Sequence, residues 1–296
     1  MTQFVQQVVA GLGDGAIYAS LALALVLIYR ATHVINFAQG EMGMFSTYIA
    51  WSLITNHGWS FWPAFFFTIL VSFLGGAAIQ QTVIRPLSRA GELTIVMATI
   101  ALLVILNGLA SWIWKPDEKL LLSPFPTGTW SVGDVQVPQQ SVFNLLVVLV
   151  CVVLLWAFFR FTKMGLALRS SAVNPTASRL LGVRVTWMLA IGWGFAAALS
   201  AVAGMLAAPA QFVFSPNFMQ VVIIYAFAAA VLGGIESPVG AVVGGLALGV
   251  TINLLGTYLP GQITPDMRLP VALAILLAVL IFRPAGLLGR AVVRRV

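Results

Sequence analysis

The sequence predicts an all-α polytopic membrane protein, a bundle of about eight to ten spanning or broken helices. Three observations lead to this class: 60% of the 296 residues are hydrophobic, only 8% are charged, and long runs of the chain carry no charge at all. Roughly a quarter of the residues of an ordinary soluble domain are charged. The 15 basic and 8 acidic side chains cannot form the polar surface of a soluble fold of this length. We therefore expect a single membrane-spanning domain over residues 1–296.

Nine apolar segments approach the roughly 20 residues that a helix needs to cross the hydrocarbon core of a bilayer. The first and last are short, and a polar run at 36–41 interrupts the second, so counts of eight and ten remain open. Three aspartates, Asp14, Asp134 and Asp266, fall at segment edges, which argues against paired acids at membrane depth. The segments cover residues 15–29, 34–55, 61–84, 93–114, 141–159, 187–208, 218–232, 239–258 and 269–282.

Basic residues indicate which loops face the cytoplasm, because inner loops of membrane proteins are enriched in lysine and arginine. Residues 160–184 carry five basic side chains and no acidic one, and four arginines follow the last segment. We expect this loop (160–186) and the C-terminus to be cytoplasmic. The loop 115–140 balances its charges and holds four prolines, which suits the outer face. The net charge of +7 is thus explained by membrane topology and predicts no nucleic-acid partner.

Several kinds of chemistry are missing from the sequence. A nucleotide-binding Walker A loop needs a Gly-Lys pair, yet none of the three lysines follows a glycine. One cysteine, Cys151, and two histidines provide neither a disulfide framework nor a metal centre. No catalytic triad or HExxH motif can be assembled. We expect no catalytic residue, no metal and no cofactor on this chain.

A polar run lies inside the second apolar segment, where Asn36, Gln39 and Glu41 accompany Gly40. Polar groups at membrane depth are costly, and unwound backbone there is tolerated only beside protein or a cavity. The run predicts a helix break. It either lines a translocation pathway or forms a re-entrant turn whose polar groups satisfy one another. Asn107, Asn144 and Asn253 stand alone in apolar runs and suggest hydrogen bonds between helices.

Small residues recur every fourth position in two regions, which is typical of helices in close contact within a membrane. Ordinary packing in one bundle, a dimer interface and a moving gate all produce this pattern. A Gly-Gly pair before Glu236 predicts a tight turn, with the carboxylate of Glu236 in solvent. The residues assigned to helix packing or gating are Gly192, Ser200, Gly204, Gly233, Gly234, Gly240 and Gly244.

The basic loop contains a predicted short helix. Asn174 suits the cap position, Pro175 suits the first turn, residues 176–181 favour a helix, and Gly182 suits its end. Such a helix either docks onto a soluble partner or lies on the lipid headgroups.

Four stretches of the sequence resemble the permease subunits of ABC importers for branched-chain amino acids, the Liv-type inner-membrane translocators. They are GDGAIYASLALALVLIYRATHVINFAQGEMGM (13–44), GLALRSSAVNPTASRLLGV (165–183), VLGGIESPVGAVVGG (231–245) and IFRPAGLLG (281–289). They occur in the expected order along nearly the whole chain. The family usually shows a histidine and an acid after INFA, whereas this chain has Gln39 and Glu41 there.

The resemblance implies a permease that pairs with a second, related permease and docks two ATP-binding cassette subunits, which hydrolyse the ATP. A solute-binding protein would deliver branched-chain amino acids or similar small polar solutes, such as amides or urea. The basic loop would then couple ATPase closure to the spans. The residues assigned to coupling are Ala172, Asn174, Pro175, Ala177, Arg179, Leu181 and Gly182.

Two other functions remain open on the sequence alone. An ion-coupled secondary transporter would need a buried acid, for which Glu41 is the best candidate. A structural membrane subunit without transport activity of its own would carry the same apolar pattern.

Overall fold

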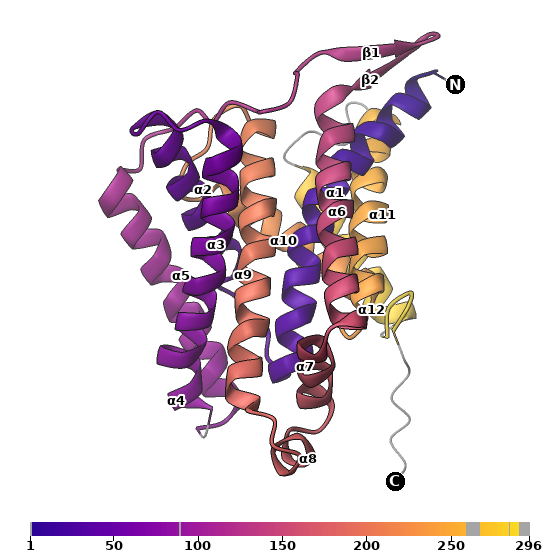
Figure 1. Ribbon diagram of the computed structural model, residues 1–296. Coiled ribbons are helices and arrows are strands. Elements are labelled where there is room, and N and C mark those ends of the chain that lie inside the picture. Colours follow the sequence, from indigo (N-terminus) through magenta and orange to yellow (C-terminus); the bar gives the residue numbers. More distant parts are fainter. Residues whose placement is uncertain (1, 89, 259–266, 284, 290–296) are drawn as a thin grey trace. The chain divides into compact units, whose positions relative to one another are not determined.

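A computed structural model describes residues 2–88, 90–258, 267–283 and 285–289, and most of the chain over these ranges is helical (Figure 1). The chain divides into two compact units. The first unit comprises residues 1–26, 125–148 and 221–296, and the second comprises 27–124 and 149–220. Three of the four boundaries fall inside helices: α1 (Thr2–Thr32), α6 (Gln139–Phe161) and α10 (Phe218–Gly233).

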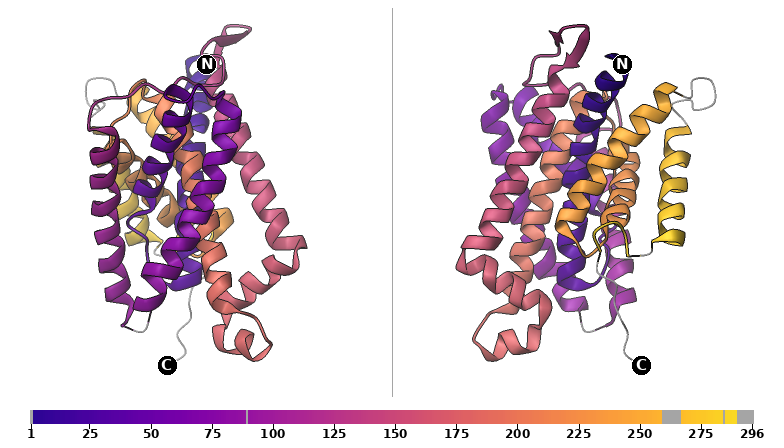
Figure 2. Two further views of the ribbon diagram at one scale, coloured as in Figure 1. Left: turned by 60° about the vertical axis from the view of Figure 1, so that its left-hand side comes forward. Right: turned by 90° about the vertical axis from the view of Figure 1, so that its right-hand side faces the viewer.

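In the first unit, residues 2–26 of α1 and parts of α6 and α10 accompany α11 (Pro238–Tyr258) and α12 (Arg268–Phe282). Figure 2 shows α12 running alongside α11. A two-stranded antiparallel hairpin, β1 (Thr129–Val132) and β2 (Val135–Pro138), precedes α6. Its two-residue turn contains Gly133 at a φ of 62°, a conformation that glycine adopts without steric cost.

The second unit holds α2 (Gln39–Thr55), α3 (Phe61–Ile79) and α5 (Glu92–Trp114). After α3 the chain continues through a π-helical turn, η1 (Gln80–Ile84), and a short α4 (Arg85–Leu87). The loop from α6 contains α7 (Lys163–Val173) and α8 (Pro175–Leu180), and α9 (Val185–Ala210) follows it. Helix α9 packs against both α2 and α3.

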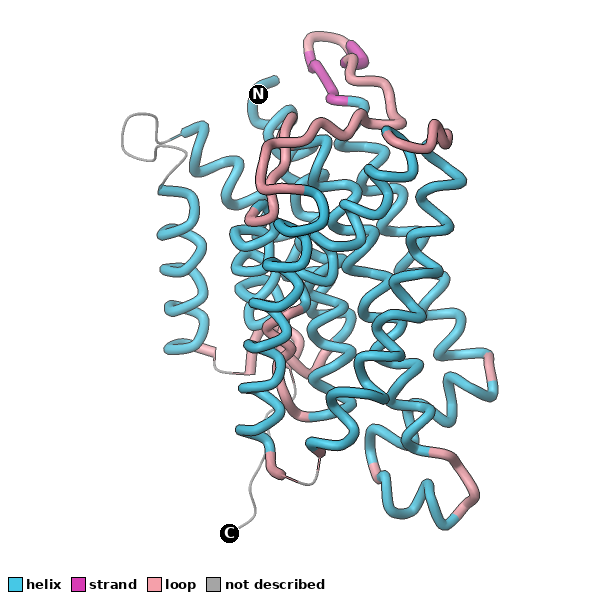
Figure 3. The backbone as a smooth tube through the Cα atoms, turned by 90° about the vertical axis from the view of Figure 1, so that its left-hand side faces the viewer, coloured by secondary structure: helices cyan, strands magenta, loops and turns pink. Residues whose placement is uncertain are grey.

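Each of the nine predicted segments contains a helix, although residues 34–38 of the second segment are not helical. Six helices among the described residues are long and apolar enough to cross a membrane, and α10 and α12 are shorter apolar helices. Figure 3 shows how little strand the described part of the chain contains, the β1–β2 hairpin apart. The all-α polytopic fold is confirmed, and its lipid-facing character explains why large apolar side chains such as Trp112 and Phe282 are more than four-fifths exposed.

Glycines allow the helices of the first unit to touch backbone to backbone. A Cβ on Gly245 would lie 2.5 Å from the Cα of Ala19, and one on Gly249 would overlap Gly15. A second face of α11 contacts α10, because a Cβ on Gly244 would be 2.8 Å from the nitrogen of Gly233. In a membrane, where apolar burial does not drive helix association, such approach gives the dispersion contacts that hold helices together. The small residues of α11 thus serve two interfaces.

In the second unit, α9 presents its small residues to its neighbours. A Cβ on Gly76 of α3 would lie 2.6 Å from the Cβ of Ala197. On the other side, a Cβ on Gly43 of α2 would lie 2.6 Å from the carbonyl oxygen of Ser200. Helix α9 therefore forms the centre of this unit, and its residues from Ser200 to Ala208 are all nearly inaccessible.

Three features differ from the sequence-based expectations. Helix α1 begins at Thr2, about four turns earlier than predicted, so Asp14 lies inside a helix and not at its edge. The β1–β2 hairpin and helix α7 were not predicted. The polar residues near the N-terminus lower the hydropathy of the first turns of α1. The start of the helix was not predicted because hydropathy indicates lipid contact and not helix length. Asp266 and the arginines 290, 294 and 295 lie outside the described residues.

Candidate functional site

The predicted helix break is present, at residues 33–38. Helix α1 ends at Thr32, His33 adopts a positive φ of 56°, and α2 begins at Gln39. Asn36 and Gln39 are inaccessible, Glu41 is 3% exposed and Gly40 is buried. The four residues assigned to a translocation pathway therefore lie together in the break and the first turn of α2.

The break is level with the middle of a long helix. The side-chain amide of Gln39 donates to the carbonyl oxygen of Ala196 at 2.9 Å and to the hydroxyl of Ser200 at 2.6 Å. Both acceptors lie near the centre of the 26-residue α9, which is long enough to cross a bilayer. The non-helical backbone thus sits at membrane depth, where it is tolerated because protein surrounds it.

Asn36 closes the break. Its Nδ2 donates to Gln39 Oε1 at 2.7 Å, and its Oδ1 accepts from the backbone nitrogen of Ala38 at 3.1 Å. Asn36 and Gln39 therefore satisfy one another and α9, which makes them structural supports of the turn. Gln39 occupies the position where this chain departs from the expected pattern. Its side chain connects α2 to α9 through these hydrogen bonds.

Glu41 has a different environment. Its Oε2 accepts a hydrogen bond from Asn107 Nδ2 of α5 at 3.2 Å. The same nitrogen donates to the carbonyl oxygen of Pro216 and to Oδ1 of Asn217, each at 3.1 Å. Pro216 and Asn217 belong to the loop between α9 and α10. Sequence reasoning identified Asn107 only as an isolated amide, and nothing in the local pattern singled out Pro216 or Asn217.

An aromatic cluster joins the same three elements. The ring of Tyr48 (α2) stacks on Trp114 (α5) with centroids 5.2 Å apart and meets Phe214 of the loop edge-on at 4.9 Å. The backbone of Phe214 also pairs with Lys119 through two hydrogen bonds of 2.9 Å. These contacts hold the loop 211–217 against α2 and α5, so the oxygens around Asn107 have a rigid support.

The basic loop forms the short helix that its sequence predicts. Asn174 Oδ1 accepts from the backbone nitrogen of Ala177 at 2.9 Å, which caps α8, and Gly182 ends the turn at a φ of 82°. Apolar side chains there are unusually open: Leu180 is 85% and Leu181 is 84% exposed. Of the residues assigned to coupling, Ala172 is half-buried and Asn174, Pro175, Ala177, Arg179, Leu181 and Gly182 are exposed.

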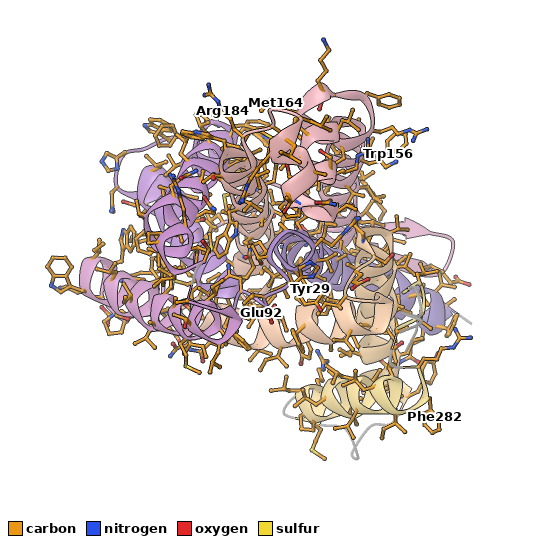
Figure 4. All side chains as sticks on the ribbon, turned by 90° about the horizontal axis from the view of Figure 1, so that it is seen from below. Tyr29, Glu92, Trp156, Met164, Arg184 and Phe282 are labelled. Atoms are coloured by element: carbon orange, nitrogen blue, oxygen red, sulfur yellow. The ribbon has the colours of Figure 1, made fainter. Side chains whose placement is uncertain are left out.

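Helix α7 connects this loop to the spans. A Cβ on Gly165 would lie 2.6 Å from the Cα of Phe159, so α7 folds back closely on the end of α6. Figure 4, seen from below, labels Met164 near the start of α7 and Arg184 directly before α9. Helix α7 packs against both α8 and α9, so it joins the short helix to a long apolar helix.

Six of the seven residues assigned to packing or gating fall into three groups. Ser200 and Gly204 face α2, whereas Gly192 has only Leu168 near it, 4.0 Å from an added Cβ. Gly233, Gly240 and Gly244 form the contact between α10 and α11.

Gly234, at a φ of 107°, belongs to a different contact. A Cβ on Gly286 would lie 2.5 Å from its nitrogen, and Leu287 N donates to Leu232 O at 2.8 Å. The C-terminal segment therefore rests on the Gly-Gly turn. Glu236 of that turn is exposed, as predicted. Over the described residues, no group of three or more histidine, cysteine or acidic side chains could hold a metal ion.

The fold and the buried polar break define a multi-pass helical membrane protein with a polar site inside the bundle. Residues 7–280 match the family model described as the branched-chain amino acid transport system / permease component. The chain belongs to this family, which is a family of transport permeases.

Three relatives extend over nearly the whole chain. LivH of Escherichia coli K12, a high-affinity branched-chain amino acid transport system permease protein, is 30% identical and covers 99% of this chain and 98% of its own length. BraD of Pseudomonas aeruginosa, of the same description, is 32% identical with the same coverage. A probable LivH of Methanocaldococcus jannaschii is 29% identical over 93% of this chain and 91% of its own length.

Proposed function

We propose that this chain is a permease subunit of an ATP-binding cassette importer in the inner membrane, and that it carries branched-chain amino acids or similar small polar solutes. The observation that carries the proposal is the match to branched-chain amino acid permeases over nearly the full length of the chain. A second, related permease would complete the pathway, two ATPase subunits would drive it, and a solute-binding protein would deliver the substrate from outside.

The exposed α8 supports a docking role for the basic loop. Leu180 and Leu181 expose apolar side chains beside the positive charge of Arg179. Clustered apolar side chains at a loop tip are costly in water and suit burial against another protein. The loop would be cytoplasmic, and ATPase closure would press on α8 and reach α9 through α7. ATP binding and hydrolysis would in this way bias an inward-facing against an outward-facing bundle.

Uptake by the complete transporter in proteoliposomes tests the proposal. With binding protein and L-leucine outside and ATP inside, we expect uptake that depends on ATP and resists uncouplers. Uptake that follows an ion gradient without ATP would instead favour the secondary transporter, with Glu41 as coupling acid. An absence of uptake by the complete complex would instead indicate a structural subunit without transport activity of its own.

The coupling assignment has its own test. Arg179→Glu, or replacement of Asn174 together with Pro175, should abolish uptake while the protein remains in the membrane. Lys115→Glu, a charge reversal in the opposite loop, is the matched control and should preserve uptake. Full uptake by the Arg179 variant would refute the assignment.

A further inference from the structure

The side-chain amide of Asn107 makes three hydrogen bonds with one nitrogen. Its Nδ2 lies 3.2 Å from Glu41 Oε2, 3.1 Å from the carbonyl oxygen of Pro216 and 3.1 Å from Asn217 Oδ1. An amide nitrogen carries only two hydrogens. Three acceptors therefore compete for two donors, and one of the three bonds is always incomplete.

The three acceptors are suited to a cation. One is a carboxylate oxygen and two are carbonyl oxygens, so the electrostatic potential where they meet is negative. A primary ammonium group has three N–H donors and no acceptor, which matches the number and type of these oxygens. Hydrogen bonds that join an ammonium to a carboxylate are also about twice as strong as neutral ones. The position that Asn107 Nδ2 occupies is thus better matched by an ammonium nitrogen than by an amide.

The oxygens are held in place from outside the site. Gln220 Nε2 donates to Asn217 Oδ1 at 3.1 Å, which orients that amide oxygen toward Asn107. The stacking of Tyr48, Trp114 and Phe214 holds the three elements that supply the acceptors. Since these supports do not involve Asn107, the three oxygens would stay together if the Asn107 side chain moved away.

The site is open on one side. Glu41 and Pro216 are buried, whereas Asn217 and Gln220 are exposed and Asn107 is half-buried. The next residue of α5 also has free space around it, because a Cβ on Gly108 would meet no atom within 4 Å. A small solute could therefore approach from the Asn217 side, and the side chain of Asn107 is only partly enclosed by protein.

We propose that Glu41, the Pro216 carbonyl and Asn217 form the subsite for the ammonium group of the transported amino acid, and that Asn107 occupies this subsite when no substrate is bound. The proposal rests on the proposed importer function and makes the substrate class more specific. Urea and simple amides have no group with three donors, so this subsite selects amino acids over those solutes.

Equilibrium dialysis of radiolabelled L-leucine with the purified permease–ATPase complex, without binding protein, tests the subsite. 4-Methylpentanoate, which keeps the carboxylate and the branched chain but lacks the ammonium, is the competing probe. We expect unlabelled L-leucine to displace the label and 4-methylpentanoate to fail. Glu41→Gln removes the negative charge and should weaken L-leucine binding roughly ten- to a hundredfold, the range for a lost hydrogen bond to a charged group.

Asn107→Ala gives the decisive result. If Asn107 only joined helices, its removal would leave leucine binding unchanged or weaker. If Asn107 occupies the subsite, its removal should tighten leucine binding, by roughly tenfold where the free site is mostly occupied by the amide. Asn253→Ala is the matched control. The amide nitrogen of Asn253 also donates to a carboxylate, that of Asp14 at 2.8 Å, but its second acceptor is the carbonyl oxygen of Gly249 in its own helix. That variant should not bind leucine more tightly.

The possible outcomes separate this proposal from the importer function. Wild-type leucine affinity in both Glu41→Gln and Asn107→Ala, in complexes that still take up leucine with ATP, would overturn the subsite alone. Equal displacement by 4-methylpentanoate, or displacement by Na⁺ alone, would also overturn it. If the Asn107→Ala complex does not assemble, Asn107→Ser, which keeps one donor, should bind leucine more tightly than wild type; unchanged or weaker binding would overturn the subsite.

Discussion

The carbonyl oxygen of Gly43 in α2 lies only 2.6 Å from the place that a Cβ would take on Gly204 in α9. The two helices therefore meet backbone to backbone one turn after the polar break. This contact fixes the start of α2 against the centre of α9, and with it the position of Glu41. The stripe of small residues in α9 thus serves the site as well as the fold.

Gly204→Ala should destabilise the second unit. The new methyl group would overlap Thr47 and Gly43, and overpacking of this kind costs about 1–3 kcal/mol. Gly192→Ala is the matched control on the same stripe, where the nearest atom, in Leu168, is 4.0 Å away. We expect a lower melting temperature in detergent only for the Gly204 variant; equal losses in both would contradict the close contact.

Gly249→Leu should separate α11 from α1. A Cβ on Gly249 would overlap the backbone of Gly15, which cannot move aside as a side chain can. Gly108→Leu, at an open position of α5, should leave the protein folded. Size-exclusion profiles of the two variants provide the measurement. A monodisperse Gly249 variant with wild-type thermal stability would show that the two helices do not approach as described.

Asn253 and Asp14 should be energetically coupled. The amide of Asn253 donates to Asp14 Oδ2 at 2.8 Å between α11 and α1. Hydrogen bonds between membrane helices contribute about 0.6 kcal/mol on average and up to about 1.7 kcal/mol. A double-mutant cycle with Asp14→Ala and Asn253→Ala, measured by unfolding in detergent, should give a coupling in this range. Additive losses would mean that the pair does not interact.

Asn174→Ala should impair uptake through the loss of a helix cap. The variant removes the acceptor for the backbone nitrogen of Ala177 and should cost α8 about 1 kcal/mol. Asn174→Asp keeps an oxygen at the cap and should restore most of the ATP-driven uptake. If the aspartate variant is as impaired as the alanine variant, Asn174 acts by something other than capping.

The side of the membrane can be tested by cysteine labelling in a Cys151→Ser background. Val173 in the basic loop is 80% exposed and Trp130 in the hairpin is 44% exposed, so cysteines there should react with an impermeant maleimide. We expect Val173→Cys to be labelled only in inside-out vesicles and Trp130→Cys only in right-side-out vesicles. The reverse pattern would invert the proposed orientation.

Much of this protein follows from local sequence. Apolar runs predicted the positions of the nine main helices, because the cost of polar groups in lipid acts on each segment separately. The caps of α8 were likewise predictable, since Asn174, Pro175 and Gly182 act on neighbouring backbone. The early start of α1 was not, because the residues before Gly15 extend a helix without adding to the apolar run.

Only the tertiary structure decided what surrounds Glu41. Asn107 is 66 residues away along the chain, and Pro216 and Asn217 are more than a hundred beyond that. Their oxygens meet because α2, α5 and the loop before α10 are held together by aromatic stacking and by the Gly43–Gly204 contact. Hydropathy and capping are local properties, whereas a converging set of hydrogen bonds depends on which helices pack together. For that reason the sequence predicted a membrane-spanning permease with a polar break, and the packing of its helices determined what that break can bind.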